Sequence, residues 1–508
     1  MLTYSFDGTS PSSLYEHLYR CIKNDIFRGV IMPGDKLPSK RSLAKNLNVS
    51  TVTVEHAYAM LMDEGYIYSL PKKGYYISDP GDFLSVSGTD PPEYHLRQDK
   101  EQAAFLQTSE YPEYQESAEQ SDDRAASSCQ EVEDQANVRF FADFVSNGTN
   151  PDNFPFSTWV RLLRETIRER QNELMINSPS GGIPELRRAI CNYLYQFRGM
   201  NVAPEQVVVG AGTEYLYSLL IQLLGRNKRF AVENPGYRKI SLIYEKNGVD
   251  CCYIPLDSRG VQIDALTEQK ADILHISPSH HFPTGIVTPI SRRRELLDWA
   301  SASEKRFIIE DDYDSEFRLG GRPLPTLQSI DCREKVIYIN TFTKSLSSTI
   351  RISYMILPPR LMRRFYEELS FYSCTVSNFE QYTLARFLSE GYFEKHINRM
   401  RKYYRNQRNA ILDCIRKNPL SRQITITEEN AGLHFLIHFP SDLSDQEIVG
   451  RAAKEGIRIS ALSEYDHRFI VSEKSVQSDT HTLIVNYSGI RPETIPEAAD
   501  RLIRAVVS

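Results

Sequence analysis

The segment Lys335-Val-Ile-Tyr-Ile-Asn-Thr-Phe-Thr-Lys344 is an apolar run that leads directly into a lysine. A short run of this kind, rich in β-branched and aromatic residues, predicts a buried strand. An earlier segment of the same kind, Arg306-Phe-Ile-Ile-Glu310, leads into Asp311-Asp312-Tyr313-Asp314. The sequence therefore predicts a lysine at the end of one buried strand, and an acid with a phenol at the end of the strand before it.

This combination of side chains is the one that pyridoxal phosphate (PLP) chemistry requires. A lysine amine forms a Schiff base with the cofactor, a carboxylate pairs with the pyridinium nitrogen, and a phenol reaches the ring hydroxyl. A surface lysine is the alternative interpretation of Lys344, and the apolar strand before it disfavours that alternative. The sequence thus predicts a PLP site around Lys344.

Length and composition indicate an ordinary globular chain. Its 508 residues allow two or more domains, and a net charge of −6 gives no chain-wide footprint for nucleic acid. The eight cysteines are scattered without a Cys-x-x-Cys motif, which predicts reduced thiols in a cytoplasm. The first seven residues lack a signal-peptide pattern, and the longest apolar stretch, 215–224, is too short to cross a bilayer. We therefore expect a cytoplasmic protein.

Three regions of the chain differ in character. Residues 1–79 show helical periodicity followed by a short hairpin pattern. Residues 80–137 carry fourteen acidic against three basic residues, which predicts a disordered linker more strongly than an acidic interaction arm. Residues 138–508 alternate apolar strands with helical patterns, which predicts an α/β domain with a mostly parallel sheet covered on both faces. The expected strands are 206–210, 229–233, 272–277, 306–310 and 336–340.

The first region has the pattern of a winged helix-turn-helix. We expect helices over residues 12–28, over 40–47, and from Ser50, which caps the last helix, to about residue 64. Two short helices joined by a tight turn are typical of DNA-binding helix-turn-helix motifs. Lys72 and Lys73 would lie at the tip of a β-wing, where they suit contact with backbone phosphates.

DNA binding is the favoured interpretation of this region, and its affinity should fall steeply with salt. Nine Lys and Arg residues stand against eight acidic ones in residues 1–79, so a small helical packing module is the alternative. Specific DNA contacts are expected from Arg41, Ser50, Thr51 and Thr53.

The segment Gly210-Ala-Gly212-Thr213-Glu214 follows a predicted strand and opens a helix. With Glu233 about twenty residues further on, it could be a degenerate dinucleotide fingerprint, but the third glycine is missing. The alternative is a phosphate cup, in which backbone amides at a helix N-terminus hold an anion. Lys344 and Asp311 favour the cup, because a PLP site needs them and a dinucleotide site does not.

Other polar groups also follow predicted strands. Thr341, Thr343 and Arg351 flank Lys344 and offer the hydroxyls and guanidinium that suit a phosphate dianion. Tyr237 could stack on the pyridine ring or be a packed turn tyrosine. All of these groups are expected at the carboxyl ends of parallel strands, where ligands bind in open α/β sheets.

Two acidic or histidine-rich segments could suggest a metal. His280 and His281 are adjacent, and neighbouring side chains on an extended segment point apart. The acidic run 311–316 lacks the glycine and the terminal glutamate of a calcium loop. We therefore predict no metal site.

The N-terminal region resembles the GntR family of winged helix-turn-helix repressors. The motifs that carry the resemblance are Leu14-Tyr-Glu-His-Leu18, Leu37-Pro-Ser-Lys-Arg-Ser-Leu-Ala44, Val49-Ser50, Ala57-Tyr58 and Glu64-Gly-Tyr-Ile-Tyr68. Together with the rest of the chain, it resembles the MocR subfamily, which joins this domain to a fold-type-I aminotransferase-like domain with a small C-terminal α+β part. The further motifs are Pro151-Asp-Asn-Phe-Pro-Phe-Ser-Thr-Trp159, Gly181-Gly-Ile-Pro-Glu-Leu-Arg187, Glu233-Asn-Pro-Gly-Tyr-Arg238, Pro278-Ser-His-His-Phe-Pro-Thr-Gly285, Glu310-Asp-Asp-Tyr-Asp-Ser-Glu-Phe-Arg318 and Thr341-Phe-Thr-Lys-Ser-Leu346.

The resemblance implies roles for individual residues. Lys344 would be the aldimine lysine, with Asp311 at the pyridine nitrogen, Tyr313 at the ring hydroxyl and Tyr237 stacked on the ring. His280 would belong to the same cofactor site. The phosphate cup would consist of Gly212, Thr213, Glu214, Thr341, Thr343 and Arg351. Family members are typically homodimers in which each DNA-binding domain lies against the partner's aminotransferase-like domain.

Departures from the family bear on the effector. Relatives that sense γ-aminobutyrate hold its carboxylate with two arginines, and the matching positions here are Lys239 and Gly489, with Arg491 two residues beyond. An arginine–carboxylate fork is geometrically specific, and lysine is not equivalent to it. The resemblance therefore implies a regulator that binds double-stranded operator DNA and senses PLP itself or another amine or amino acid. A working aminotransferase with an accessory DNA-binding domain is the alternative.

Overall fold

The computed structural model describes residues 4, 14–27, 30–32, 34–47, 49–63, 66–70, 74–77, 140–146, 148–319, 324–430, 432–468 and 480–507. The predicted linker over 80–137 and the predicted wing-tip lysines, Lys72 and Lys73, lie outside these residues. Within them, no helix is both long enough and apolar enough to cross a membrane.

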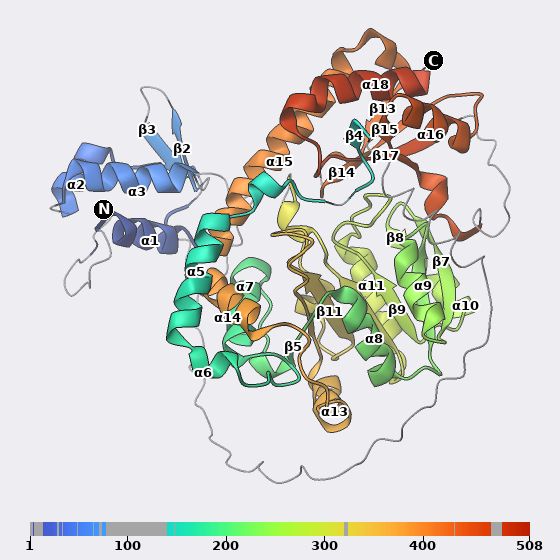
Figure 1. Ribbon diagram of the computed structural model, residues 1–508, viewed down its shortest axis with the longest axis horizontal. Coiled ribbons are helices and arrows are strands. Elements are labelled where there is room, and N and C mark those ends of the chain that lie inside the picture. Colours follow the sequence, from blue (N-terminus) through green and yellow to red (C-terminus); the bar gives the residue numbers. More distant parts are fainter. Residues whose placement is uncertain are drawn as a thin grey trace, which may run out of the picture. The chain divides into compact units, whose positions relative to one another are not determined.

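The N-terminal part is a helical unit with a small antiparallel sheet of order β1-β3-β2 (Figure 1). Its elements are α1 (Leu14–Phe27), β1 (Lys36–Leu37), α2 (Lys40–Leu47), α3 (Thr51–Asp63), β2 (Ile67–Leu70) and β3 (Gly74–Ile77). Ser50 caps α3, because its hydroxyl accepts the Thr53 backbone N–H at 3.0 Å. Leu18, Leu43 and Tyr58 pack into one buried core. The predicted helix-turn-helix is confirmed over the described residues.

The large sheet contains eight strands in the order β5-β12-β11-β10-β9-β6-β7-β8. The strands are β5 (Val207–Gly210), β6 (Arg229–Asn234), β7 (Asp250–Asp257), β8 (Gly260–Val261), β9 (Ile273–Ile276), β10 (Phe307–Asp311), β11 (Val336–Thr341) and β12 (Ser353–Ile356). Neighbours from β11 through β7 pair in parallel, whereas β12 pairs antiparallel with both β11 and β5. The predicted mostly parallel sheet is confirmed, with β12 as an antiparallel strand inside it.

Helices cover both faces of this sheet, as Figure 1 shows. Because side chains alternate along a strand, Ile337 and Ile339 of β11 pack in one buried cluster while Tyr338 packs in another. Leu220 of α8 shares the cluster of Ile337. The helices of this region are α5 (Phe156–Glu169), α6 (Gln171–Leu174), α7 (Pro184–Arg198), α8 (Thr213–Leu224), α9 (Arg238–Lys246), α10 (Ile263–Glu268), α11 (Ile290–Ser301), α12 (Leu327–Ile330), α13 (Pro359–Glu368) and α14 (Asn378–Ser389).

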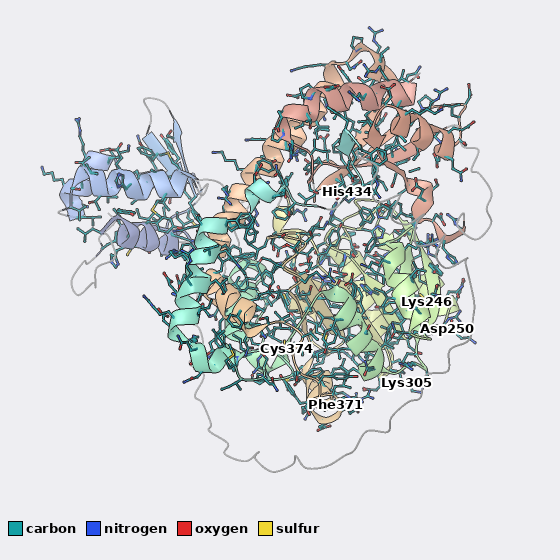
Figure 2. The ribbon with its side chains drawn as sticks, in the orientation of Figure 1. Lys246, Asp250, Lys305, Phe371, Cys374 and His434 are labelled. Atoms are coloured by element: carbon teal, nitrogen blue, oxygen red, sulfur yellow. The ribbon has the colours of Figure 1, made fainter. Side chains whose placement is uncertain are left out.

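A long helix, α15 (Tyr392–Lys417), leads to a second sheet with its own helices. This four-stranded sheet has the order β13-β14-β17-β16, and a short pair joins β15 to β4. The strand β14 of the four-stranded sheet begins at His434, which is labelled in Figure 2. The elements are β4 (Ala142–Asp143), β13 (Thr425–Thr427), β14 (His434–Phe439), α16 (Asp445–Lys454), β15 (Ile457–Arg458), β16 (Ser460–Ala461), β17 (His481–Asn486) and α18 (Ile495–Val507). The small α+β part implied by the family resemblance is therefore present.

Arg293 on α11 is a fully buried cation that ties three backbone segments together. Its guanidinium donates to the carbonyl oxygens of Pro278, Thr288 and Pro325 at 2.8–2.9 Å. It also lies 3.6 Å from the buried carboxylate of Glu310 on β10. These contacts hold the turn that follows β9 against the end of β10.

We expect Arg293→Met to lower the free energy of unfolding by about 3–5 kcal/mol, because it leaves three carbonyl oxygens without a donor and Glu310 without its counter-charge. Denaturant unfolding of the full-length protein measures this loss. Arg294→Met makes the same change at the adjacent exposed position and is the control. An equal loss in the two variants would contradict this account of Arg293.

Candidate functional site

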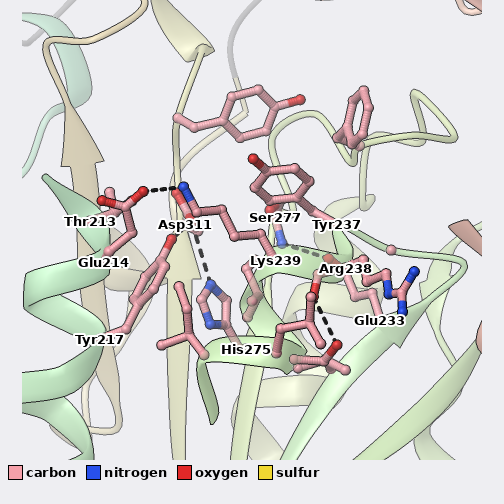
Figure 3. Close-up of a pocket in the computed structure, with 18 of the residues that line it drawn as sticks. Thr213, Glu214, Tyr217, Glu233, Tyr237, Arg238, Lys239, His275, Ser277 and Asp311 are labelled. Carbon is pink, nitrogen blue, oxygen red and sulfur yellow. Dashed lines mark hydrogen bonds and ion pairs between the residues drawn. The ribbon is translucent and has the colours of Figure 1, made fainter. Parts of the chain in front are cut away.

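The carboxyl ends of the parallel strands surround a cavity of about 580 Å³ (Figure 3). The cavity brings together ten of the predicted site residues, which are Gly212, Thr213, Glu214, Tyr237, Asp311, Tyr313, Thr341, Thr343, Lys344 and Arg351. His280 is not among its lining residues. The residues predicted from separate strand ends therefore share one site.

Lys344 follows β11 and is buried, with 9% of its surface exposed. Burial lowers the pKa of its amine to about 7, although the nearby Asp314 carboxylate acts in the opposite direction. A substantial fraction of the amine is therefore neutral near neutral pH. A neutral amine is the nucleophilic form that reacts with a carbonyl group.

Asp311, at the end of β10, is held by groups that the sequence did not reveal. One of its oxygens, Oδ2, accepts the Tyr217 hydroxyl and lies 3.5 Å from His275 Nε2. His275 in turn contacts the Tyr244 hydroxyl through Nδ1 at 2.6 Å. The other carboxylate oxygen, Oδ1, is buried and has no hydrogen-bond partner among the described residues. Such an acceptor fits a protonated ring nitrogen.

Tyr313 is connected to a buried histidine and acid behind it. Its hydroxyl lies 3.2 Å from His280 Nδ1, and that nitrogen lies 2.8 Å from Asp314 Oδ2. Burial raises the pKa of Tyr313 well above its usual value, so the phenol stays protonated. His280 therefore reaches the cavity through Tyr313.

The end of the cavity at α8 has the features of a phosphate cup. Gly212 precedes the helix with φ +93°, and a Cβ there would lie 2.5 Å from Arg351 Nη2. Only glycine combines this backbone conformation with so close a guanidinium. Thr341 and Thr343 line the same cavity, and their hydroxyls lie 2.7 Å apart. A helix N-terminus, hydroxyls and a guanidinium together suit a phosphate dianion, so the residues present fit PLP.

Glu214 contributes a carboxylate to the same end of the cavity. It accepts hydrogen bonds from Lys239 and from Arg351, and Figure 3 marks its contact with Lys239. Burial acts to raise the pKa of Glu214, but these two hydrogen bonds outweigh it and lower this pKa. The carboxylate is therefore ionised where the cofactor phosphate would bind.

A second acid, Glu233, lies in the cavity wall, and its environment keeps it protonated. Burial raises the pKa of Glu233 to about 8, although the Ser277 backbone N–H donates to its Oε2 at 2.9 Å. The nearest cation candidate, His281, lies 3.4 Å away, and burial lowers its pKa to about 3. Both side chains are thus uncharged near neutral pH. The sequence analysis assigns Glu233 no role in the PLP site, only a position in a possible dinucleotide fingerprint and in a family motif.

The helix-turn-helix presents its predicted DNA contacts on the surface. Ser50 and Thr51 are exposed at the start of α3, and Arg41 is exposed on α2. Thr53 is partly exposed and bonds to the Ser50 hydroxyl at 2.8 Å. Among the described residues, no group of three His, Cys, Asp or Glu side chains is arranged to hold a metal ion.

Comparison with known families agrees with this two-part organisation. Residues 14–77 match the family of bacterial regulatory proteins called gntR, and residues 146–502 match aminotransferase class I and II. Members of the second family bind PLP. The kynurenine aminotransferase of Pyrococcus horikoshii has a similar fold, with a TM-score of 0.63 and 23% identity over 74% of this chain and 93% of that one.

Similar proteins share the whole length of the chain. The uncharacterized regulator YdeL of Bacillus subtilis is 36% identical over 99% of this chain and 98% of its own. The probable rhizopine catabolism regulatory protein MocR of Rhizobium meliloti is 30% identical over 100% of this chain and 96% of its own. The pyridoxine biosynthesis regulator PdxR of Corynebacterium glutamicum is 30% identical over 91% of each chain.

A gntR-type helix-turn-helix fused to an aminotransferase-like domain defines a class of transcriptional regulators. The chain belongs to the MocR-type subfamily of GntR regulators.

We expect Lys344→Met to raise the thermal unfolding midpoint of the cofactor-free protein at neutral pH. The folded state disfavours the charged amine, so protonation of Lys344 opposes folding at and below pH 7, by up to about 5 kcal/mol. This cost falls as the pH rises from 7 towards 10.5, the usual pKa of lysine, because the unfolded state then also loses its proton.

The difference in midpoint between Lys344→Met and the unsubstituted protein should therefore shrink across that pH range. Lys402→Met, at an exposed position on α15, shows how the same substitution acts away from the cavity. A difference that grows with pH would contradict the burial of Lys344.

Proposed function

We propose that this protein is a DNA-binding transcriptional regulator whose aminotransferase-like domain holds PLP and senses PLP itself or a small amine or amino acid. One observation carries the proposal. The buried Lys344 amine, with a pKa of about 7, lines the same cavity as Asp311, whose Oδ1 has no hydrogen-bond partner in the part of the chain that the structure describes, and the helix-turn-helix precedes this domain.

Each of four residues around the cavity would make a different contact with the cofactor. Lys344 would offer its neutral amine, Asp311 would accept a hydrogen bond from the protonated ring nitrogen, and Tyr313 would donate one to the ring hydroxyl. Tyr237 would cover the ring. When bound, PLP supplies an aldehyde that reacts reversibly with amines. The cavity excludes most of the solvent around Lys344, which keeps that amine reactive.

The residues at positions 239 and 489 make γ-aminobutyrate a poor candidate for the effector. Lys239 is engaged with Glu214, and at Gly489 a side chain would begin 3.4 Å from the carbonyl oxygen of Gly148. Neither position offers a guanidinium fork for a carboxylate. The name of the relative PdxR, a pyridoxine biosynthesis regulator, supports PLP as the ligand to test first.

The regulatory role further implies a homodimer that binds a double-stranded operator, and a place of action in the cytoplasm, where such an operator would be found. Occupation of the cavity would shift the balance between two arrangements of the dimer that differ in affinity for the operator.

A working aminotransferase is the second candidate, because Lys344, Asp311 and Tyr313 are all present around the cavity. Sustained transfer of an amino group from a donor amino acid to a keto acid would favour it. A single half-reaction that then stops would favour the regulator.

We expect Lys344→Ala to abolish the visible absorbance of bound PLP and the response of DNA binding to ligand, while DNA binding without ligand persists. The amine is needed to bind PLP, so its removal should abolish the absorbance and the ligand response. Lys344 lies outside the helix-turn-helix, so DNA binding without ligand should remain. Titration of PLP and candidate amines during gel-shift or anisotropy measurements on the protein's own upstream DNA tests this. Lys305→Ala, at an exposed position, is the control. An unchanged ligand response in Lys344→Ala would refute sensing at this residue.

We expect Arg41→Ala to weaken binding to the operator by about 1–3 kcal/mol and to weaken binding to unrelated DNA less, because a base contact carries specificity. Competition between operator and unrelated DNA at fixed salt measures the difference. Arg333→Ala removes an exposed arginine from the aminotransferase-like domain and should leave both affinities unchanged. An equal loss on both DNAs would assign Arg41 to backbone phosphates.

A further inference from the structure

The end of the cavity at α8, where the cofactor phosphate would bind, contains the carboxylate of Glu214. Glu214, in the first turn of α8, accepts hydrogen bonds from Lys239 at the start of α9 and from Arg351 just before β12. The three side chains are 33%, 51% and 48% exposed, respectively, so they lie at the mouth of the cavity. Lys239 and Arg351 therefore share one carboxylate.

The guanidinium of Arg351 lies against the residue that precedes α8, at the phosphate end of the cavity. Its guanidinium packs so closely on Gly212 that a Cβ at that residue would overlap it. Its backbone also has a positive φ of 52°, which an L-amino acid rarely adopts. In this arrangement, a phosphate group at the start of α8 would contact Arg351 while Glu214 also binds that guanidinium.

A phosphate group at this end of the cavity would be both attracted and repelled by the charges around it. The N-terminus of α8 and the guanidinium of Arg351 attract a dianion, whereas the Glu214 carboxylate repels it. Lys239 stays neutralised as long as Glu214 accepts its hydrogen bond. The cup thus contains the donors that phosphate needs and also a competitor for the strongest of them.

We propose that the Glu214 carboxylate is an internal competitor for the cofactor phosphate, and that it weakens PLP binding enough for the cofactor to exchange with free PLP. This inference rests on the proposed function and deepens it. A regulator that reports the concentration of PLP must release it when that concentration falls, whereas an enzyme gains from holding its cofactor permanently. Glu214 supplies weak binding without any change to Lys344, Asp311 or Tyr313.

If Glu214 competes with the phosphate, replacing it should change the affinity for PLP but not for a ligand that lacks the phosphate. Glu214→Gln keeps the size of the side chain, removes its charge, and adds an amide that can donate to phosphate. We expect it to increase the affinity for PLP about tenfold, because it removes one repulsive charge at a partly exposed site. The affinity for pyridoxal, which has the same ring and aldehyde without a phosphate, should stay the same.

The measurement is a titration of full-length, cofactor-free protein with PLP or pyridoxal, followed by visible absorbance and checked by equilibrium dialysis. Glu497→Gln is the control, because Glu497 also pairs with an arginine, Arg501, at an exposed position on α18. This control should bind both ligands as the unsubstituted protein does.

The possible outcomes separate the inference from the proposed function. If Glu214→Gln binds PLP no more tightly than the unsubstituted protein, or tightens PLP and pyridoxal equally, Glu214 is not a competitor for phosphate. In either case the protein still binds PLP and the proposed function stands. If neither form binds PLP, both the inference and the proposed function are overturned.

Discussion

The parallel pairing of β11, β10, β9 and β6 is the constraint on which the rest of the aminotransferase-like domain depends. Parallel strands must be joined by crossovers, so each strand ends at the same edge of the sheet and each next segment starts there. Residues that are far apart in sequence, such as Tyr237, Asp311 and Lys344, consequently meet around one cavity. The cavity is a product of topology, and its chemistry depends on which side chain follows each strand.

Several ionisable side chains are buried around the cavity, and burial of a charge is unfavourable. The protein offsets this penalty differently at different residues. Arg293 keeps its charge because three carbonyl oxygens and Glu310 surround it. Glu233 gives up its charge, since its pKa rises to about 8 without a cation close by. Lys344 is intermediate, with a pKa of about 7. Burial also raises the pKa of Glu310 to about 7 despite the nearby Arg293, so groups close to their titration points occur both behind the cavity and in its lining. Such perturbed groups often gather at functional sites.

The sequence was sufficient to predict the features that are local. The strand before Lys344, the helix that opens at Thr213 and the cap at Ser50 each follow from a few adjacent residues. The surroundings of Asp311 could not be predicted in this way. Tyr217 lies on α8 and His275 on β9, and their contact with Asp311 depends on helix packing and strand register. A histidine inside the apolar run 272–277 was the one available signal, since a buried polar group needs a partner.

The small C-terminal part of the chain also packs against His280, the residue behind Tyr313. Gly432, just before β14, lies so close to His280 that a Cβ there would be 1.9 Å from the imidazole, and its carbonyl oxygen accepts the Tyr487 hydroxyl at 2.7 Å. His280 in turn contacts Tyr313. Spatial contact alone is not coupling, which requires two states that a ligand distinguishes. These contacts form a continuous path from Tyr313 through His280 to Gly432, two residues before β14. If the proposed exchange of PLP takes place at this cavity, these contacts are a physical connection through which occupancy could reach the second sheet.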